Sequence, residues 1–251
     1  MQLPYLLNPI VAHRGAWLEF NLPENSLASL QKAIEIGAGA TEFDVHLTAD
    51  HVLVVHHDAD FFGLKIEDCT YEQLSVYTLS NGEKLPLVSD FLALGLKQSQ
   101  TKLVFEIKSS EKSTQRTLQM VDEVVKLLNG NDYTQKLEFI LFCWEGAKYL
   151  KQQVPMYNVS YLNGDKTPEE VSNANLNGID YNIKLYKKHQ HYIEQAKAHN
   201  LILNSWTVNH KDDVAFLLAA NFDMITTNKP QEFLENYKKA TLYKSCFSIK
   251  L

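Results

Sequence analysis

Short apolar runs alternate with amphipathic runs along nearly the whole chain. The apolar runs are rich in Val, Ile, Leu and Phe, as in residues 102–108 (KLVFEIK). In the amphipathic runs, apolar positions recur at helical spacing, as in residues 114–131 (TQRTLQMVDEVVKLLNGN). The first pattern is typical of buried strands and the second of helices that cover a sheet. The sequence therefore predicts strands and helices in alternation.

The positions of the predicted elements follow directly from these runs. Strands are expected at residues 9–13, 40–48, 52–58, 102–108, 137–144, 156–163, 178–186, 201–209 and 223–228. Helices are expected at residues 24–37, 87–98, 114–131, 145–153, 168–175, 188–200, 211–221 and 230–240. The first helix has Asn25 or Ser26 as its N-cap and Gly37 as its stop signal.

The number of repeats indicates the fold class. Strand–helix alternation repeated about eight times is typical of an α/β fold closed as a (β/α)8 TIM barrel. A length of 251 residues suits one barrel, so we expect a single domain over residues 1–251. The alternative, a doubly wound open sheet, usually has a glycine-rich phosphate loop after its first strand, which this sequence lacks. The tail, residues 240–251, is left open as an extra strand, a packed segment or a loose end.

Composition and charge narrow the class of partner. The formal net charge of −6 argues against binding to nucleic acid. Three widely spaced cysteines indicate neither a disulfide framework nor a zinc site, and we expect a reduced, cytoplasmic location. The N-terminal residues lack the features of a signal peptide, and no apolar run is long enough for stable membrane insertion. The oligomeric state stays open, with a homodimer among the alternatives.

Candidate chemistry is concentrated at the ends of the predicted strands, where barrel enzymes carry their active sites. Alternate residues of a strand share one face and lie about 6–7 Å apart, so Glu42 and Asp44 point the same way. If the apolar residues between them pack under the helices, both acids face the barrel interior. The same parity brings Glu106 and Lys108 inward from the next barrel strand. Three carboxylates are therefore expected to converge.

Three carboxylates in a partly dry site repel one another, and a bound divalent cation would resolve this. Ligands that offer only oxygen indicate a hard ion, Mg²⁺ or Ca²⁺. Arg14 and Lys108 then remain to bind an anion, for which phosphate is suited. His13 and His57 lie at the same strand ends and could supply a general base and a general acid.

An ordered set of motifs carries a family resemblance. They are HRG, PENS, EFDVHLTADHVLVVHHD, FEIK, SWTVN and DMITTNKP, and they extend from about residue 10 to about residue 232. Each motif alone is weak evidence for a family, but each one lies at the end of a separately predicted strand. In this order and spacing the chain resembles the glycerophosphodiester phosphodiesterase family.

The resemblance implies a fold, an activity and a set of site residues. It implies a (β/α)8 barrel with a short insertion after the second strand, at roughly residues 59–80. It implies metal-dependent hydrolysis of a glycerophosphodiester to glycerol 3-phosphate and an alcohol, in glycerol and lipid metabolism. The implied residues are His13 and His57 as catalytic groups, Glu42, Asp44 and Glu106 as metal ligands, and Arg14, Lys108 and Trp206 as substrate contacts.

Some positions depart from the family pattern or allow a structural interpretation. Residues 59–68 replace the arginine and threonines that are usual there, and Asn228 stands where aspartate is usual. Only one of His56 and His57 can point inward, and the family pattern favours His57. His46 is interpreted as structural or supporting. Glu24 and Asn25 are interpreted mainly as the start of a helix, and support of the metal site is the less favoured role.

The alternatives concern both substrate and class. A lysophospholipase D-type or phosphoinositide-cleaving enzyme would use the same chemistry and is expected to need an apolar rim, which the sequence does not reveal. A barrel that binds phosphodiesters without turnover is expected to have lost a histidine or a metal ligand, and none is lost. The head group, Mg²⁺ versus Ca²⁺, and a cyclic intermediate versus direct attack by water stay open.

Overall fold

A closed barrel of parallel strands forms the centre of the computed structural model, which describes residues 6–248. Its strands are β1 (Ile10–Ala12), β2 (Ala40–Leu47), β6 (Lys102–Ile107), β7 (Leu137–Leu141), β8 (Val159–Tyr161), β9 (Gly178–Asn182), β10 (Ile202–Trp206) and β11 (Ile225–Thr227). They are hydrogen-bonded in the order β10-β9-β8-β7-β6-β2-β1-β11. Backbone hydrogen bonds from Met224 to Leu203 (3.1 Å) and from Val208 to Thr226 (2.9 Å) link β10 to β11 and close the ring. The predicted TIM barrel is confirmed.

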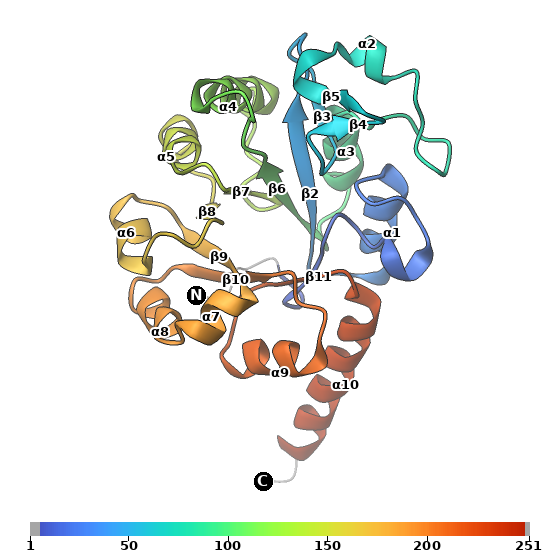
Figure 1. Cartoon of the computed structure of the whole chain (residues 1–251). Coiled ribbons are helices and arrows are strands. Elements are labelled where there is room, and N and C mark those ends of the chain that lie inside the picture. Colours follow the sequence, from blue (N-terminus) through green and yellow to red (C-terminus); the bar gives the residue numbers. More distant parts are fainter. Residues whose placement is uncertain (1–5, 249–251) are drawn as a thin grey trace.

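Helices surround the strands on the outside (Figure 1). They are α1 (Leu27–Ile36), α3 (Val88–Gly95), α4 (Thr114–Leu128), α5 (Trp144–Gln153), α6 (Pro168–Asn173), α7 (Ile183–Lys188), α8 (His191–Ala198), α9 (Lys211–Ala219) and α10 (Pro230–Ser248). A short 3-10 turn, η1 (Leu18–Phe20), follows β1. Among the described residues, no helix is both long enough and apolar enough to cross a membrane.

The limits of α1 agree with the sequence prediction and have clear local causes. Ser26 is the N-cap, and its hydroxyl accepts a hydrogen bond from the Ser29 amide at 3.0 Å. Gly37 ends the helix in a left-handed conformation (φ 77°), which glycine adopts without steric cost. These two ends fix where the chain re-enters the barrel at β2.

The alternation along the strands sorts side chains between two cores. Phe43 on β2 contacts Phe91 of α3 and Phe105 of β6, with ring centroids 5.1 and 4.9 Å apart, in the layer between strands and helices. Val104, one residue from Phe105, belongs instead to the smaller apolar cluster inside the barrel. The predicted inward and outward faces of β2 and β6 are therefore correct, and the acids at the ends of these strands face the interior.

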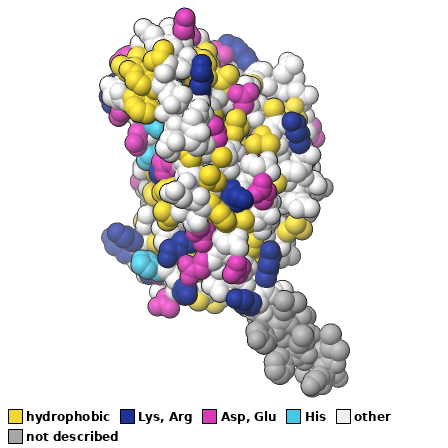
Figure 2. Space-filling model, turned by 90° about the vertical axis from the view of Figure 1, so that its right-hand side faces the viewer, with side chains coloured by type: hydrophobic (Ala, Val, Ile, Leu, Met, Phe, Trp, Pro, Cys, Tyr) yellow, Lys and Arg dark blue, Asp and Glu magenta, His cyan; other side chains and the backbone are white. Residues whose placement is uncertain are grey.

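The insertion after β2 forms a small separate layer. It consists of β3 (Leu53–Val55), which pairs antiparallel with β2, followed by β4 (Asp60–Phe61), β5 (Leu64–Lys65), η2 (Ile66–Asp68) and α2 (Tyr71–Leu74). Phe62 and Val76 are 60% and 73% exposed, and Phe62 stacks on Tyr77 with centroids 5.0 Å apart. Figure 2 shows hydrophobic side chains gathered at the upper end of this face, the end at which Figure 1 places the insertion.

Several predicted elements are longer than those observed, and three predicted boundaries assign residues to the wrong kind of element. The strand expected over residues 178–186 ends at Asn182, whose side chain caps α7 by accepting the Lys184 amide at 3.0 Å. Trp144, expected at a strand end, begins α5. The tail expected from residue 240 continues α10 as far as Ser248, and residues 249–251 lie outside the described part of the chain.

Candidate active site

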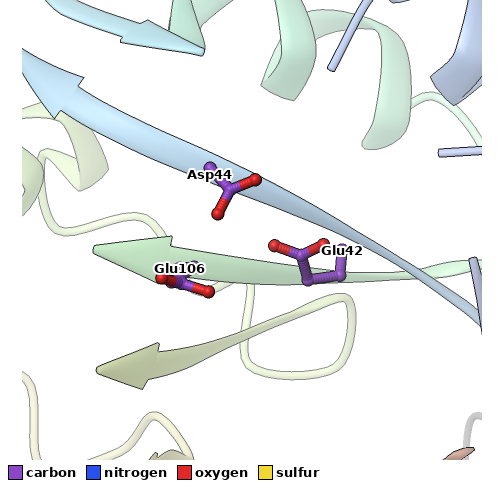
Figure 3. A group of neighbouring side chains, drawn as sticks. All are labelled: Glu42, Asp44 and Glu106. Atoms are coloured by element: carbon purple, nitrogen blue, oxygen red, sulfur yellow. The ribbon is translucent and has the colours of Figure 1, made fainter. Parts of the chain in front are cut away.

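Three buried carboxylates meet at the inner face of the barrel. Glu42 and Asp44 on β2 and Glu106 on β6 each offer one oxygen atom, and these atoms lie within 4.8 Å of one another. Figure 3 shows the three carboxylates close together, with Glu42 and Asp44 on β2 and Glu106 on the neighbouring strand β6. The register of the sheet causes this, because Asp44 and Glu106 are direct partners across β2 and β6. We call these three residues the acid cluster.

Two cationic side chains contact the acid cluster. Lys108 Nζ lies 3.2 Å from Asp44 Oδ1 and 2.8 Å from Glu106 Oε1. Arg14 Nε lies 3.5 Å from Asp44 Oδ2, and the Arg14 amide donates a hydrogen bond to Glu42 Oε2 at 2.9 Å. The second oxygen of Glu42, Oε1, is buried and accepts no hydrogen bond from any described residue. A buried carboxylate oxygen without a partner is costly, so a ligand is expected to satisfy it.

The cluster is short of positive charge, because three carboxylates face two cations, one of which also binds Glu24. Burial, followed by the charges of Asp44 and Glu106, raises the pKa of Glu42 well above its ordinary value. Burial and the charge of Asp44 raise the pKa of Glu106 to about 7. Burial also acts to raise the pKa of Asp44, but Lys108, His57 and Arg14 outweigh it and hold this pKa at about 2.

A divalent cation fits these residues. It would supply the missing positive charge and occupy the unpartnered oxygen of Glu42, and it would favour the ionised form of all three carboxyls. The donors are oxygen atoms only, which hard cations prefer. Glu42, Asp44 and Glu106 are the residues that would hold such an ion.

The turn after β1 places His13 and Arg14 beside the acid cluster. Arg14 and Gly15 both adopt left-handed backbone conformations, with φ of 57° and 81°. A Cβ atom on Gly15 would lie 2.3 Å from Ser29 Oγ, so α1 can pack this closely only against glycine. The turn is held by the Asn25 amide, which donates to the Arg14 carbonyl at 3.0 Å. Arg14 adopts an uncommon conformation, as residues at functional sites often do.

Two imidazoles flank the cluster, each held through Nδ1. His13 Nδ1 lies 2.6 Å from Asn228 Oδ1, and His57 Nδ1 lies 2.7 Å from Asp58 Oδ1. Because amide and carboxylate oxygens only accept hydrogen bonds, Nδ1 carries the proton in both rings. Burial, with the charge of Arg14, lowers the pKa of His13 to about 4, so His13 is neutral at neutral pH. Its Nε2 then has a free lone pair, 4.0 Å from Glu42 Oε2.

The other two histidines of this region make contacts outside the cavity. His46 is buried, and its Nε2 lies 3.1 Å from the His57 carbonyl oxygen. His56 packs edge-on against Phe61, with ring centroids 5.1 Å apart. His57 lines the central cavity and His56 does not. The structure therefore places His57 at the cavity and His56 away from it, as the family pattern predicts.

Glu24 and Asn25 do more than begin a helix. Asn25 Nδ2 donates to Asp44 Oδ2 at 2.8 Å, and the Asp44 amide donates back to Asn25 Oδ1 at 3.2 Å. Glu24 accepts two hydrogen bonds from Arg14 Nη1, at 2.9 and 3.0 Å. The structural interpretation from sequence was too narrow, because both residues orient side chains of the site. The signal that could have revealed this is the PENS stretch, one of the motifs on which the family resemblance rests.

A cavity of about 250 Å³ contains the whole predicted site. The eight residues predicted from sequence all line it: His13, Arg14, Glu42, Asp44, His57, Glu106, Lys108 and Trp206. The apolar lining residues Ile140, Phe142, Leu162 and Trp206 belong to one cluster of packed side chains. Trp206 packs edge-on against Phe142, with ring centroids 5.5 Å apart. The cavity thus has a charged half and an apolar half.

Comparisons with known proteins agree with this geometry. The model of the glycerophosphoryl diester phosphodiesterase family matches residues 13–232. A glycerophosphodiester phosphodiesterase of Caldanaerobacter subterraneus is 27% identical, over 92% of this chain and 98% of the relative. The crystal structure of a glycerophosphodiester phosphodiesterase from Parabacteroides distasonis is 35% identical and has a TM-score of 0.89, over 93% of this chain and 98% of that chain.

A more distant structure shares the fold. It is a phosphodiesterase of Oleispira antarctica, solved in complex with the product sn-glycerol-3-phosphate. It is 20% identical to this chain and has a TM-score of 0.79, over 92% of this chain and 97% of that chain. At this identity the likeness concerns the barrel fold alone.

Proposed function

The chain belongs to the glycerophosphoryl diester phosphodiesterase family, and on that premise we propose that it hydrolyses glycerophosphodiesters at the cavity that contains the acid cluster. The products are glycerol 3-phosphate and an alcohol. One observation carries the proposal: three buried carboxylates, short of positive charge, lie in the same cavity as two imidazoles whose Nδ1 atoms are both occupied.

The charged half of the cavity binds the phosphate. When bound at the acid cluster, a divalent cation, Mg²⁺ or Ca²⁺, would neutralise phosphate charge and act as a Lewis acid. Arg14 and Lys108 line the same space and bind phosphate oxygens, for which guanidinium and ammonium groups are well suited. Both cations are already fixed by contacts with Asp44, so they are oriented before the substrate arrives.

The two histidines divide the proton transfers. His13 is neutral, and its Nε2 takes the proton from the attacking hydroxyl, which is water or the glycerol 2-hydroxyl. Attack by the 2-hydroxyl leaves a cyclic phosphate when the alcohol departs, and a water then opens this ring to glycerol 3-phosphate, with His57 taking the proton of the water and His13 returning its proton to the 2-oxygen. His57 gives a proton to the oxygen of the departing alcohol, with Asp58 stabilising its protonated ring. The two proton transfers balance, since one proton leaves the nucleophile and one proton reaches the leaving group. Asn228 and Asp58 each accept the hydrogen bond of Nδ1–H, which leaves Nε2 as the reactive nitrogen on both rings.

Product identity tests the proposal. The protein is incubated with glycerophosphocholine and a divalent metal, and the products are separated and identified. We expect glycerol 3-phosphate and choline from the wild type, strongly reduced turnover in His13→Ala, and unchanged turnover in His189→Ala, a histidine remote from the cavity lining. Release of phosphocholine and glycerol would contradict the assignment, because the other ester bond would then be cleaved.

A lysophospholipase D-type reaction is the second candidate, favoured by a feature that the sequence did not reveal. The insertion exposes Phe62, Val76 and Tyr77, and Phe61 links this apolar group to His56, next to His57. Such a surface could hold an acyl chain. Lysophosphatidylcholine compared with glycerophosphocholine, at equal concentration and below the micellar limit, separates the two candidates.

A further inference from the structure

One carboxyl in the cavity does not belong to the acid cluster. Asp180, on β9, is 1% exposed and lines the cavity. Its Oδ2 accepts a hydrogen bond from Asn204 Nδ2 at 3.0 Å. Its Oδ1 is buried and has no hydrogen-bond partner within the described part of the chain. Leaving such an atom unpaired is costly, so Oδ1 requires an explanation.

The surroundings of Asp180 point to a neutral ligand group. Asp180 lines the cavity together with the apolar residues Ile140, Leu162 and Trp206. Among the described residues, it does not belong to the group of carboxylates that could hold a metal ion. Burial, followed by the charge of Glu106, raises its pKa well above the ordinary value. A buried carboxyl oxygen that has no partner and lies among apolar lining residues suits a ligand hydroxyl, which can donate a hydrogen bond to it, better than a hydrated cation.

A network of hydrogen bonds fixes the orientation of Asp180. Trp206 Nε1 donates to the Asp180 carbonyl oxygen at 2.8 Å, which couples the aromatic wall to this strand. Asn204, the partner of the carboxyl, accepts the Thr226 hydroxyl at 3.2 Å, and its backbone carbonyl accepts the Tyr186 hydroxyl at 3.0 Å. These contacts hold Oδ1 in place before any ligand binds, as a preorganised recognition group requires.

We propose that Asp180 Oδ1 hydrogen-bonds the terminal hydroxyl of the glycerol half of the substrate. With the phosphate at Arg14 and Lys108, the carbon skeleton extends along Trp206 into the apolar half. The terminal hydroxyl is the one farther from phosphorus, and it would be unpaired there without a polar partner. Asp180 supplies that partner and would determine the specificity for the glycerol half. This inference rests on the proposed function.

This contact selects against acylated substrates. A lysophospholipid acylated at the terminal oxygen lacks the hydroxyl and brings a bulky chain to the same place. A site built around a hydrogen bond to a hydroxyl rejects analogues that lack it, because its own polar atom is left unpaired. The contact with Asp180 therefore disfavours the lysophospholipase D-type reaction, although the insertion offers an apolar surface.

The test compares two diesters that differ in one hydroxyl. Glycerophosphocholine is compared with 2-hydroxypropyl phosphocholine, which has hydrogen in place of the terminal hydroxyl. We expect the wild type to prefer the first by about 10- to 100-fold in kcat/KM, the range for one hydrogen bond to a buried partner. Asp180→Ala should abolish this preference by slowing glycerophosphocholine alone. Asp180→Asn keeps both a donor and an acceptor and should retain most of the preference.

A matched control removes another buried carboxyl of the barrel interior. Glu138 pairs with Lys102 at 2.6 Å, has an unpartnered oxygen among the described residues, and does not line the cavity. Glu138→Gln is expected to change stability while leaving the ratio between the two diesters unchanged. A loss of the ratio in this variant as well would contradict a specific role of Asp180.

Two failures can be told apart. If the wild type turns over neither diester, the proposed function is contradicted. If Asp180→Ala loses activity equally on both diesters, only the Asp180 contact is contradicted. Fast turnover of 1-acyl lysophosphatidylcholine would likewise contradict only this contact. Calorimetric titration with glycerol 3-phosphate and with 2-hydroxypropyl phosphate does not depend on turnover. Tighter binding of the first by the wild type but not by Asp180→Ala supports the contact, and equal binding by the wild type overturns it.

Discussion

His56 and His57 are neighbours in the chain, yet their side chains have different surroundings. His57 faces the cavity, with Nδ1 fixed by Asp58, whereas His56 packs against Phe61. The carbonyl of His57 is held in turn by His46 at 3.1 Å. One histidine is therefore placed for proton transfer, and the other stabilises the insertion.

Replacing each histidine separates these roles. His57→Ala should lower turnover by roughly 10²–10⁴-fold, the usual contribution of a general acid. His56→Ala should keep turnover near the wild-type value and lower the free energy of unfolding by about 1 kcal/mol, as expected for a lost packing contact. Steady-state kinetics and thermal denaturation of both variants are the measurements. An inactive His56 variant beside an active His57 variant would reverse the assignment.

Strand parity and the family motifs predicted which residues would line the site, because position in a strand fixes the side on which a residue lies. All eight predicted residues line one cavity. The residues that orient them were missed or given too small a role, because their contacts join distant positions. Asn228 lies 215 positions from His13, and Asp180 contacts Asn204 across two strands. A single sequence without a fold does not show such pairs.

At the scale of elements, the insertion is fastened to the start of α1. Glu83, after α2, accepts hydrogen bonds from the amides of Leu27 and Ala28 at 2.8 and 3.1 Å. These amides are in the first turn of α1 and have no partner within the helix. The negative charge of Glu83 also favours the positive end of the helix dipole. Through α1, Glu83 stabilises the loop that carries Asn25.

Removal of this cap should lower stability. Glu83→Ala leaves two helix amides without their partner and is expected to cost about 1 kcal/mol, the typical value of an N-terminal cap. Glu72→Ala is the matched control, since Glu72 is exposed in the same insertion and makes no side-chain hydrogen bond among the described residues. Urea denaturation of the two variants measures the difference. Equal stabilities would show that the cap contributes nothing.

The order and type of the elements were predictable from periodicity, but some boundaries were not. The apolar run through Ile183 and Tyr186 continues the pattern of β9, yet these residues lie in α7. Tyr181, Ile183 and Leu185 recur at every second position, as in a strand, whereas Ile183 and Tyr186 have the three-residue spacing of a helix. The cap at Asn182 decides between the two patterns. Exposure of Phe62 in the insertion was equally hidden, because sequence alone does not show which aromatic residues remain uncovered.

At the scale of the whole molecule, the barrel brings together residues that are far apart in the chain. Side chains from the ends of β1, β2, β6 and β10 meet because parallel strands place all their C-terminal ends at one mouth. The convergence of the acids was therefore predictable from the fold. The cluster's shortage of positive charge was predicted too, but which of its carboxyls have a raised pKa was not, since this depends on burial and on which cations contact each one.

Removal and return of the metal tests the central claim most directly, namely that the acid cluster works with a divalent cation. We expect protein stripped with a chelator to release no glycerol 3-phosphate from glycerophosphocholine, and Mg²⁺ or Ca²⁺ to restore the reaction. Glu42→Gln should require a higher metal concentration, because a neutral amide replaces one anionic ligand. Full activity of the stripped wild-type protein would contradict the account.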